Sequence, residues 1–443
     1  MNKHIGRRDL LRAGGWGLAA ATAGSLFGAC GAGGRPGGSS EVGITGNTVK
    51  IGAHFPLTGV AAPGYSDIPT GTKAYFDYVN AHGGVNGRKI EYIFRDDAYN
   101  PSNTSQVVNE LVLQDQVFAI VGGLGTAPHS AVLDFLNSEG VPDLFVSSGS
   151  LLWDQPKKNP YTFGWQPDYE VEGKIIGRYV HRNMPNARVG LFLQDDDFGD
   201  DGEKGARAYL GDQVVAAQRY VSGNTDVAPQ IAALQAAGAD LVLGFNVPSY
   251  TALSQLASLK LNYRPQWFYS NVGSDPALVG SLLSRFSKGE VSGASMLDGV
   301  ITTEYLAGVE EADDPWVELW QQVWDAHGGE GELTNFRLYG MAEAYTFVQT
   351  LQAAGPDPTR DGLVAALEKV GAELQGPGLA PFRYSGDSHA GMAGVKVSRL
   401  AGNSTEKLSP VFVTDNGKAE ITEYTGRNPG PPPNGIPSVE PVG

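Results

Sequence analysis

The chain has 443 residues, a formal net charge of −16 and a single cysteine, Cys30. One cysteine cannot build a disulfide framework, and the acidic balance argues against nucleic acid or an anionic membrane surface as the partner. The length allows two domains of ordinary size, each with a substantial core.

The N-terminal segment has the features of an export signal. Arg7 and Arg8 form a twin-arginine pair, and the Gly/Ala-rich stretch that follows ends at Cys30. This stretch is too short and too mildly apolar for a permanent membrane span. We therefore predict that residues 1–29 are a twin-arginine signal peptide ending in a lipobox, and that Cys30 receives the lipid. An ordinary signal peptide followed by an incidental cysteine is the alternative.

Low-complexity segments flank the part of the chain that can fold. Residues 30–47 are rich in glycine and serine and are predicted to be a flexible, lipid-anchored tether. Residues 426–443 are rich in proline and show no apolar periodicity, which predicts a disordered tail. The folded part is thus expected between about Thr48 and Tyr424.

The first half of the folded part alternates strand and helix patterns. Apolar residues at every second position from Val49 to Phe55 predict a strand, and the helical pattern that follows stops at Gly83 and Gly84. Asn100 is predicted to cap the next helix. Further strands are expected at 90–95, 118–122 and 144–146, the last two as short apolar runs of the kind buried in parallel sheets.

The same alternation restarts in the second half. Strands are expected at 189–193, 214–217, 241–245 and 267–269, with a helix around 231–237 between them. A helical region from 315 to 370 follows both halves, and its tryptophans Trp316, Trp320 and Trp324 form a stripe that we interpret as core. The pattern is that of an α/β protein, in which ligands bind at the carboxyl ends of parallel strands.

Two loops at such strand ends are candidate ligand contacts. Residues 122–128 follow a buried strand, but a dinucleotide fingerprint would need a glycine where Pro128 stands, so no nucleotide cofactor is predicted. Backbone N–H groups and the Thr126 hydroxyl could instead cradle a carboxylate, the alternative being glycines needed only for the tight turn. Residues 147–150 add serine donors at the same sheet edge. Neither loop carries lysine or arginine, which favours a small carboxylate over a phosphate.

No catalytic or metal-binding pattern is present in the sequence. The acidic run from Asp195 to Asp201 lacks the spacing of a calcium loop and is interpreted as a helix-capping turn with Phe198 directed into the cleft. The chain has no Gly-x-Ser-x-Gly motif, and its histidines lack metal-ligand spacing. We therefore predict a protein that is not an enzyme and that uses no metal or cofactor.

The order and spacing of several short motifs resemble those of the branched-chain amino-acid-binding family of ABC-transporter solute receptors, the type I periplasmic binding proteins. The motifs are residues 51–59, 83–88, 96–101, 138–142 and 197–199, and the likeness spans almost all of residues 48–415. The resemblance implies an α/β fold of two Rossmann-like lobes joined by a three-strand hinge. Lobe one would comprise 48–165 plus 300–375, and lobe two 166–299 plus 376–415.

The resemblance also implies site residues by position. Thr126, Ala127, Gly149 and Ser150 correspond to lobe-one contacts to a ligand carboxylate, and Tyr65 corresponds to a wall of the side-chain pocket. From lobe two, Phe198 corresponds to an aromatic closing residue, and Asn246 and Asn271 fall near positions that face the ligand ammonium group.

Two positions depart from the family pattern. Leu151 stands where a hydroxyl is common, and no acidic residue stands beside Asn271 in the sequence. A buried ammonium group without a carboxylate partner is costly, on the order of several kcal/mol. Asp275 could replace the missing carboxylate after a small loop shift.

The resemblance implies an extracytoplasmic solute-binding lipoprotein of an ABC importer, at the outer face of the cell membrane or in the periplasm. The expected ligand is a branched-chain amino acid or a similar small hydrophobic carboxylate, which a monomeric receptor captures by hinge closure and delivers to a permease driven by cytoplasmic ATPases. A receptor for aromatic or aliphatic organic acids, and a ligand sensor that does not transport, remain alternatives.

Overall fold

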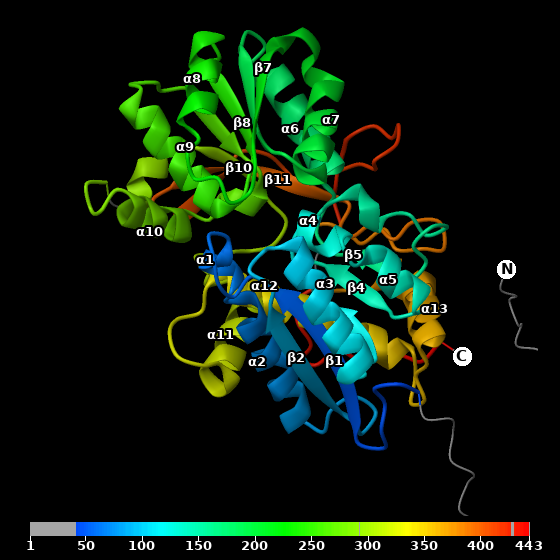
Figure 1. Ribbon diagram of the computed structural model, residues 1–443. Helices are drawn as coiled ribbons and strands as arrows, with labels where there is room; N and C mark the ends of the chain where they lie inside the picture. The colour runs from blue at the N-terminus through cyan, green and yellow to red at the C-terminus, as the bar shows by residue number, and fades with distance from the viewer. Residues whose placement is uncertain (1–40, 292, 427–428, 443) are drawn as a thin grey trace, which may run out of the picture. The chain divides into compact units, whose positions relative to one another are not determined.

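The computed structural model describes residues 41–291, 293–426 and 429–442, and in them the chain forms two β-sheets flanked by helices (Figure 1). The predicted signal peptide and Cys30 lie outside the described residues. None of the helices in the described part combines the length and the apolarity needed to cross a lipid bilayer.

The first sheet is a five-stranded parallel sheet in the order β2-β1-β3-β4-β5. Its strands are β1 (Thr48–Phe55), β2 (Lys89–Asp96), β3 (Ala119–Val121), β4 (Asp143–Val146) and β5 (Thr162–Gly164). Between them lie α1 (Ala62–Tyr65), α2 (Ile68–Ala81), α3 (Pro101–Asn109), the π-helical turn η1 (Glu110–Gln114), α4 (Thr126–Ser130), α5 (Leu133–Ser138) and the 3₁₀ turn η2 (Leu151–Trp153). The Asn100 side chain accepts bonds from the N–H groups of Ser102 and Asn103, which confirms the predicted N-cap of α3.

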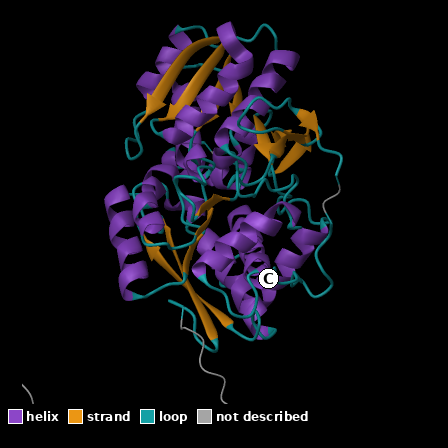
Figure 2. Ribbon diagram, turned by 90° about the vertical axis from the view of Figure 1, so that its right-hand side faces the viewer, coloured by secondary structure: helices purple, strands orange, loops and turns teal. Residues whose placement is uncertain are grey.

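Three late helices return to this first sheet. They are α11 (Pro315–His327), α12 (Asn335–Ala353) and α13 (Arg360–Val370), and α11 and α12 both pack against α2. Trp316, Trp320 and Trp324 are buried, as predicted for a core stripe. Figure 2 shows helices on either side of the strands.

The second sheet has the order β14-β13-β11-β10-β9-β8-β6-β7, with β12 paired to β11. Its strands are β6 (Val189–Gln194), β7 (Val214–Tyr220), β8 (Leu241–Phe245), β9 (Gln266–Tyr269), β10 (Ile301–Glu304), β11 (Gly394–Ala401), β12 (Ser404–Lys407), β13 (Phe412–Val413) and β14 (Thr422–Glu423). The covering helices are α6 (Tyr169–Asn183), α7 (Asp197–Leu210), α8 (Ala228–Ala236), α9 (Pro248–Lys260) and α10 (Pro276–Phe286). Four 3₁₀ turns complete the described elements: η3 (Gly211–Gln213), η4 (Asn271–Gly273), η5 (Ala294–Leu297) and η6 (Gly371–Glu373).

The chain crosses between the two sheets three times, after β5, after β10 and before β11. The crossing segments are bonded to one another: Met392 N donates to Trp165 O at 3.0 Å, and Leu379 N donates to Tyr305 O at 2.8 Å. Each sheet with its helices therefore forms a lobe, and the two lobes are joined by three adjacent segments. This is the α/β architecture that the resemblance predicted.

The structure moves two predicted lobe boundaries. Residues 376–390, predicted in lobe two, stay with lobe one, where Tyr384 donates to Gly164 O and His389 Nδ1 lies 2.9 Å from Thr162 O. β10, which the prediction placed in lobe one, pairs with β9 and β11 and belongs to the second sheet. The crossing back to lobe one comes after Glu304. A four-residue strand carries no sequence signal for the sheet that it joins, and the helical pattern that returns to lobe one begins only at Pro315.

Both predicted low-complexity flanks are partly folded. Ile44 forms an antiparallel β-bridge with Val49, and Lys50 N donates to Gly43 O, so this part of the predicted flexible tether folds back against the start of β1. Residues 429–442 of the tail, predicted to be disordered, lie against lobe one, where Tyr75 donates to Gly435 O and Trp316 Nε1 donates to Pro429 O. The prediction of disorder is wrong for these residues, because their backbone carbonyls are bound by side-chain donors of the helices.

Candidate functional site

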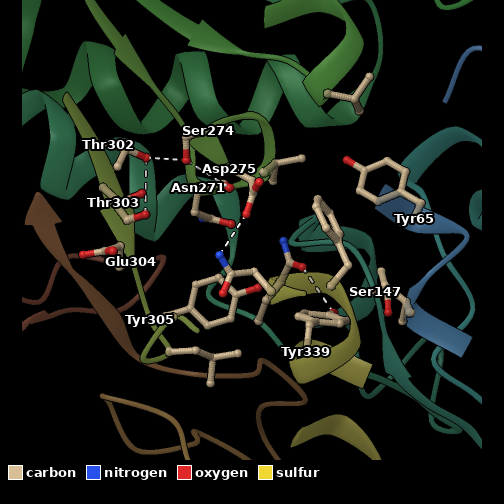
Figure 3. A pocket seen from close by; sticks show the side chains of 18 of the residues that line it. Tyr65, Ser147, Asn271, Ser274, Asp275, Thr302, Thr303, Glu304, Tyr305 and Tyr339 are labelled. Carbon is tan, nitrogen blue, oxygen red and sulfur yellow. Dashed lines mark hydrogen bonds between the residues drawn. The ribbon is translucent and has the colours of Figure 1, made fainter. Parts of the chain in front are cut away.

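A cavity lies between the two lobes, at the carboxyl ends of the strands (Figure 3). Its volume is about 180 Å³, room for on the order of ten water molecules and hence for a solute of comparable size. Figure 3 shows Asn271, Ser274 and Asp275 on one side of the cavity, and Tyr65 and Ser147 on the opposite side. Both lobes therefore contribute side chains to a single site.

Aromatic side chains form much of the cavity wall. Five tyrosines and two phenylalanines are among the lining residues that the structure describes: Tyr65, Tyr99, Tyr169, Tyr305, Tyr339, Phe198 and Phe336. Tyr169 and Phe198 pack with ring centroids 4.2 Å apart, and Tyr65 and Phe336 meet edge to face. Burial raises the pKa of Tyr169 to about 12, so its hydroxyl remains a neutral donor at physiological pH.

The glycine-rich turn brings a hydroxyl to the lobe-one wall. Gly125 has φ +102° and its Cα lies close to Tyr99, so a side chain at this position would be strained and would meet the Tyr99 ring at 2.6 Å. α4 begins at the next residue, and Thr126 Oγ1 lies 2.8 Å from Ser148 Oγ. Tyr169 OH donates to the same serine oxygen at 3.5 Å. Thr126 and Tyr169 thus face the cavity as members of one hydroxyl cluster.

A buried carboxylate lies directly behind the lobe-two wall. Glu172 accepts bonds from Asn271 N at 2.8 Å, from Ser270 Oγ at 2.9 Å and from Thr303 Oγ1. Burial raises the pKa of Glu172, and these three bonds act in the opposite direction. Asn271 Nδ2 has no hydrogen-bond partner among the described residues, and it lines the cavity. The same amide acts on Glu172 and lowers its pKa, so Asn271 links the buried carboxylate to the cavity wall.

Carboxylates are the only charged side chains among the described residues that line the cavity: Asp275, Glu304 and Glu310. Asp275 caps α10 and also accepts from Asn335 Nδ2 at 2.8 Å, while Glu304 is paired with Lys396 at 3.3 Å. Glu310 forms no ion pair within the described chain, and burial together with the neighbouring acids raises its pKa. The cavity thus favours a cationic group over a second anion.

Four of the eight predicted ligand-contact residues line this cavity. They are Tyr65 and Thr126 from lobe one and Phe198 and Asn271 from lobe two, and Asp275 joins them. Phe198 follows the helix cap Asp196, as the capping interpretation of the acidic run predicted. The sequence showed no acid beside Asn271, whereas the fold brings Glu172 there from 99 residues earlier in the chain.

The other four predicted residues are not among those that line the cavity. Gly149 is covered by Tyr169 and Pro167, and the Ser150 hydroxyl caps the N–H of Leu152. Asn246 is buried and donates to Thr251 Oγ1 at 2.5 Å. Ala127 lies one residue beyond Thr126 in α4, on a different side of the helix turn. Trp153 and Trp165 are buried core residues and do not line the cavity either.

Sequence reasoning missed several lining side chains. Tyr99 lies three residues after the end of β2, within one of the family-like motifs, and could have been found by the strand-end rule. Gln166, Tyr305 and Glu310 lie in the crossing segments, and Tyr339 lies in a late helix. Their places depend on how distant segments meet, for which one sequence carries no signal.

Hydrogen bonds close the cleft around the cavity. Ser249 Oγ of lobe two donates to Val60 O of lobe one at 2.7 Å, and Leu151 N of lobe one donates to Asp201 Oδ2 of lobe two at 2.9 Å. The bond between Asn335 and Asp275 is a third contact of this kind. The structure therefore has its lobes in contact on both sides of the site.

Comparison with known proteins finds relatives that are named as amino-acid-binding proteins. Leu/Ile/Val-binding protein homolog 2 of Brucella abortus is 25% identical over 335 residues, which are 72% of this chain and 82% of that protein. An amino acid binding protein of Pseudomonas aeruginosa is 27% identical over 207 residues, 44% of this chain and 52% of that protein. In this second match, and in others like it, the chain spans about half the length of the curated relative.

Solved structures share the fold. A fatty acid ABC transporter substrate-binding protein from Thermomonospora curvata superposes with a TM-score of 0.73 at 21% identity, covering 85% of this chain and 95% of that one. A branched-chain amino acid ABC transporter protein from Thermus thermophilus with bound valine gives 0.72 at 18% identity, covering 84% and 98%. The family model described as periplasmic binding protein matches residues 48–405. Since this match covers both lobes and most of the chain, the protein belongs to the periplasmic binding protein family.

Proposed function

We propose that the protein is an extracytoplasmic receptor of an ABC importer, which captures a small amino acid between its lobes and delivers it to a permease. The observation that carries the proposal is the chemistry of the interlobe cavity, in which aromatic walls, neutral donors and carboxylates surround a space of amino-acid size. Contacts from both lobes would stabilise the closed state, because a solute favours the state in which it has more contacts.

The cavity chemistry favours an amino acid over an organic acid. The Thr126 hydroxyl and Asn271 Nδ2 can donate to a solute carboxylate without any protein cation. The Asp275 and Glu310 carboxylates can attract an ammonium group, and the rings of Tyr65 and Phe198 can cover an aliphatic or aromatic side chain. A solute with a carboxylate and no amino group would leave the acidic side of the cavity unmatched.

Several of the relatives are named as receptors of branched-chain amino acids, and one is named as a fatty acid receptor. The Brucella proteins are named Leu/Ile/Val-binding protein homologues, and the Thermus thermophilus structure contains valine. The Thermomonospora curvata protein is a fatty acid receptor with the same fold. A fatty acid or aromatic acid is therefore the alternative solute that an experiment has to exclude.

The decisive experiment compares leucine with two analogues that each lack one charged group. Thermal unfolding is measured with leucine, with 4-methylpentanoate and with 3-methylbutylamine at equal concentrations, because a ligand of the folded state raises the unfolding temperature. Leucine should give the largest shift, and each analogue should bind at least about tenfold more weakly, the loss expected for one charged hydrogen-bonded group. If 4-methylpentanoate binds as tightly as leucine, the protein is an organic-acid receptor.

A pair of variants of α4 locates the contact. Thr126→Val removes the cavity hydroxyl and should weaken leucine binding by about tenfold, the effect of one hydrogen bond to a charged group. Ser130→Ala is the matched control, because the Ser130 hydroxyl donates to Ala127 O at the other end of the same helix. Equal affinities of the two variants would exclude Thr126 as a contact.

Export and lipid attachment are part of the proposal. Cleavage before Cys30 and acylation of this residue would hold the receptor at the outer face of the membrane, beside its permease. Mass spectrometry of the N-terminal peptide should find acyl chains on Cys30, and an unmodified N-terminus would remove this part. A sensor that closes without transport would bind the same solutes but would require a signalling partner instead of a permease.

A further inference from the structure

Four ionisable side chains form an unbroken buried chain behind the glycine-rich turn of lobe one. His54 Nδ1 lies 2.8 Å from Asp97 Oδ2, His54 Nε2 lies 2.9 Å from His129 Nδ1, and His129 Nε2 lies 2.8 Å from Asp143 Oδ2. All four side chains are 0% exposed. The chain connects the end of β2, β1, α4 and β4, and none of its members lines the cavity.

The geometry requires one more proton than two neutral imidazoles provide. Each of the three contacts has hydrogen-bond length and therefore needs one hydrogen between its heavy atoms. A neutral imidazole carries one N–H group and an ionised carboxylate carries none, so the two rings supply two hydrogens for three contacts. Without a third, two nitrogen lone pairs would face each other across 2.9 Å at the contact between His54 and His129.

We propose that the two histidines share one excess proton, carried as an imidazolium by His129, and that this proton positions Thr126 at the solute cavity. In this arrangement His129 donates through Nδ1 to His54 and through Nε2 to Asp143, and neutral His54 donates through Nδ1 to Asp97. The buried chain then has a net charge of −1, from two carboxylates and one imidazolium.

The surroundings of the two rings support this assignment. Burial lowers the pKa of His54, the bond to Asp97 raises it, and the His129 charge lowers it, so the neutral form is placed at His54. Asp97 also accepts hydrogen bonds from Thr104 Oγ1 and Tyr99 N, and these neutral donors stabilise its negative charge without a cation. Asp143 accepts from Thr162 Oγ1, and its other oxygen has no partner among the described residues.

The Asp143 end of the four linked side chains therefore has the less compensated negative charge. Asp143 has the fewer neutral donors, and an imidazolium at His129 compensates its charge directly. The ionisable groups that act most strongly on His54 are the other members, and His129 is otherwise covered by the edge of the Trp153 ring, with centroids 5.0 Å apart. The buried Glu343 carboxylate lies at Gly122, the residue before the one that covers the histidine pair.

The excess proton is coupled to the cavity through two short connections. Gly123 lies on the histidine pair, where a Cβ would come within 2.7 Å of both His54 Nε2 and His129 Nδ1. His129 N donates to Gly125 O at 3.0 Å, so the ring and the turn that presents Thr126 belong to one helix end. Loss of the proton would drive the two rings apart and displace this turn.

Nuclear magnetic resonance of the protein labelled with ¹⁵N-histidine tests the proposal without any solute. At pH 5 to 6, His129 should show protons on both ring nitrogens and His54 a proton on Nδ1 alone. Raising the pH should remove one proton from the pair in a single step, and the backbone amide signals of Gly125 and Thr126 should shift with the same midpoint. His181 is an internal control, because its ring is exposed and contacts the neutral amide of Gln213, far in the sequence from the four buried side chains.

Two variants distinguish an effect of the excess proton from an effect of side-chain packing. Asp143→Asn keeps a hydrogen-bond acceptor but removes the charge, and it should lose the doubly protonated ring at neutral pH. Thr162→Val removes a neutral donor to the same carboxylate, and it should keep the doubly protonated ring. The proposal would be overturned if both rings of the unaltered protein were singly protonated throughout the pH range. It would also be overturned if the amide signals of Gly125 and Thr126 did not shift at the histidine step.

The consequence for binding rests on the proposed function and is measured separately. Leucine affinity should fall at least threefold as the pH passes the midpoint of the histidine step. If leucine does not bind at any pH, the amino-acid proposal fails, while the resonance experiment still decides whether the excess proton is present.

Discussion

Glu172 is the residue that holds the lobe-two wall of the cavity together. Its two oxygens accept from the loop after β9 and from β10, and two of the donor residues, Asn271 and Thr303, face the solute space. The carboxylate itself is fully buried, and it forms no ion pair among the residues that the structure describes. It orients the wall without lining the cavity itself.

Replacement of Glu172 should show which property of the side chain matters. Glu172→Gln retains an acceptor for Asn271 N and Thr303 and should change the free energy of unfolding by no more than about 1 kcal/mol. Glu172→Ala leaves three buried donors unpaired and should cost about 3 kcal/mol. Urea unfolding measures both. A glutamine variant as unstable as the alanine variant would mean that the charge, and not the acceptor geometry, is required.

The stability difference between the parent protein and Glu172→Gln should depend on pH, and the sign of this dependence follows from the pKa of Glu172. Burial raises the pKa of Glu172 in the folded state, so between its usual pKa and this raised value the folded protein binds more protons than the unfolded one. Stability of the parent relative to Glu172→Gln should therefore decrease as the pH rises through this interval.

At the scale of elements, the C-terminal segment 429–442 acts as a strap across lobe one. Tyr75, Tyr78 and Gln352 donate to carbonyl oxygens of Gly435, Asn434 and Pro437 respectively, which ties the strap to α2 and α12. Its prolines lose little conformational entropy on ordering, so these bonds suffice without an apolar periodicity.

Removal of the strap should destabilise lobe one and leave the cavity intact. Truncation after residue 428 should lower the free energy of unfolding by about 3 kcal/mol, from several hydrogen bonds of about 1 kcal/mol each, partly replaced by water. Gly435→Ala should cost about 1 kcal/mol or more by itself, because Gly435 has φ +64° and a Cβ would meet Leu319 at 2.5 Å. Solute affinity should not change, and a loss of binding would show that the strap supports the site.

Individual elements show how much of the structure can be predicted from the sequence. The alternating pattern at 49–55, the apolar runs of β3 and β4 and the Asn100 cap predicted their elements because each signal is local. Thr126 and Phe198 were found for the same reason, since each follows a recognisable strand end. Glu172 beside Asn271, Ser150 outside the cavity and the bound tail depend on contacts between distant segments, which residue patterns do not encode.

At the scale of the whole molecule, polar contacts between the two lobes hold the cleft closed. One of them uses Asp201 on α7, which accepts from Leu151 N across the cleft at 2.9 Å. Burial in the closed cleft, with Asp197 and Asp168 nearby, raises the pKa of Asp201 to about 7. An open cleft would expose this carboxyl to water and return its pKa to the usual value of about 4.

Closure should therefore take up a proton at Asp201, and solute affinity should depend on pH. Between about pH 4 and pH 7 the closed state binds more protons at Asp201 than the open state. The Asp201 contribution to affinity should therefore fall as the pH rises, by up to about tenfold per unit, and should become constant above about pH 8. Isothermal titration with the amino acid that gives the largest thermal shift measures this dependence. Asp201→Asn should remove the fall between about pH 4 and pH 7 while retaining an acceptor for Leu151 N. Asp200→Asn, one residue earlier on the same helix and paired with Arg219 at the surface, should leave the profile unchanged. An unaltered profile in Asp201→Asn would assign the proton uptake to another group and reduce this contact to a neutral hydrogen bond.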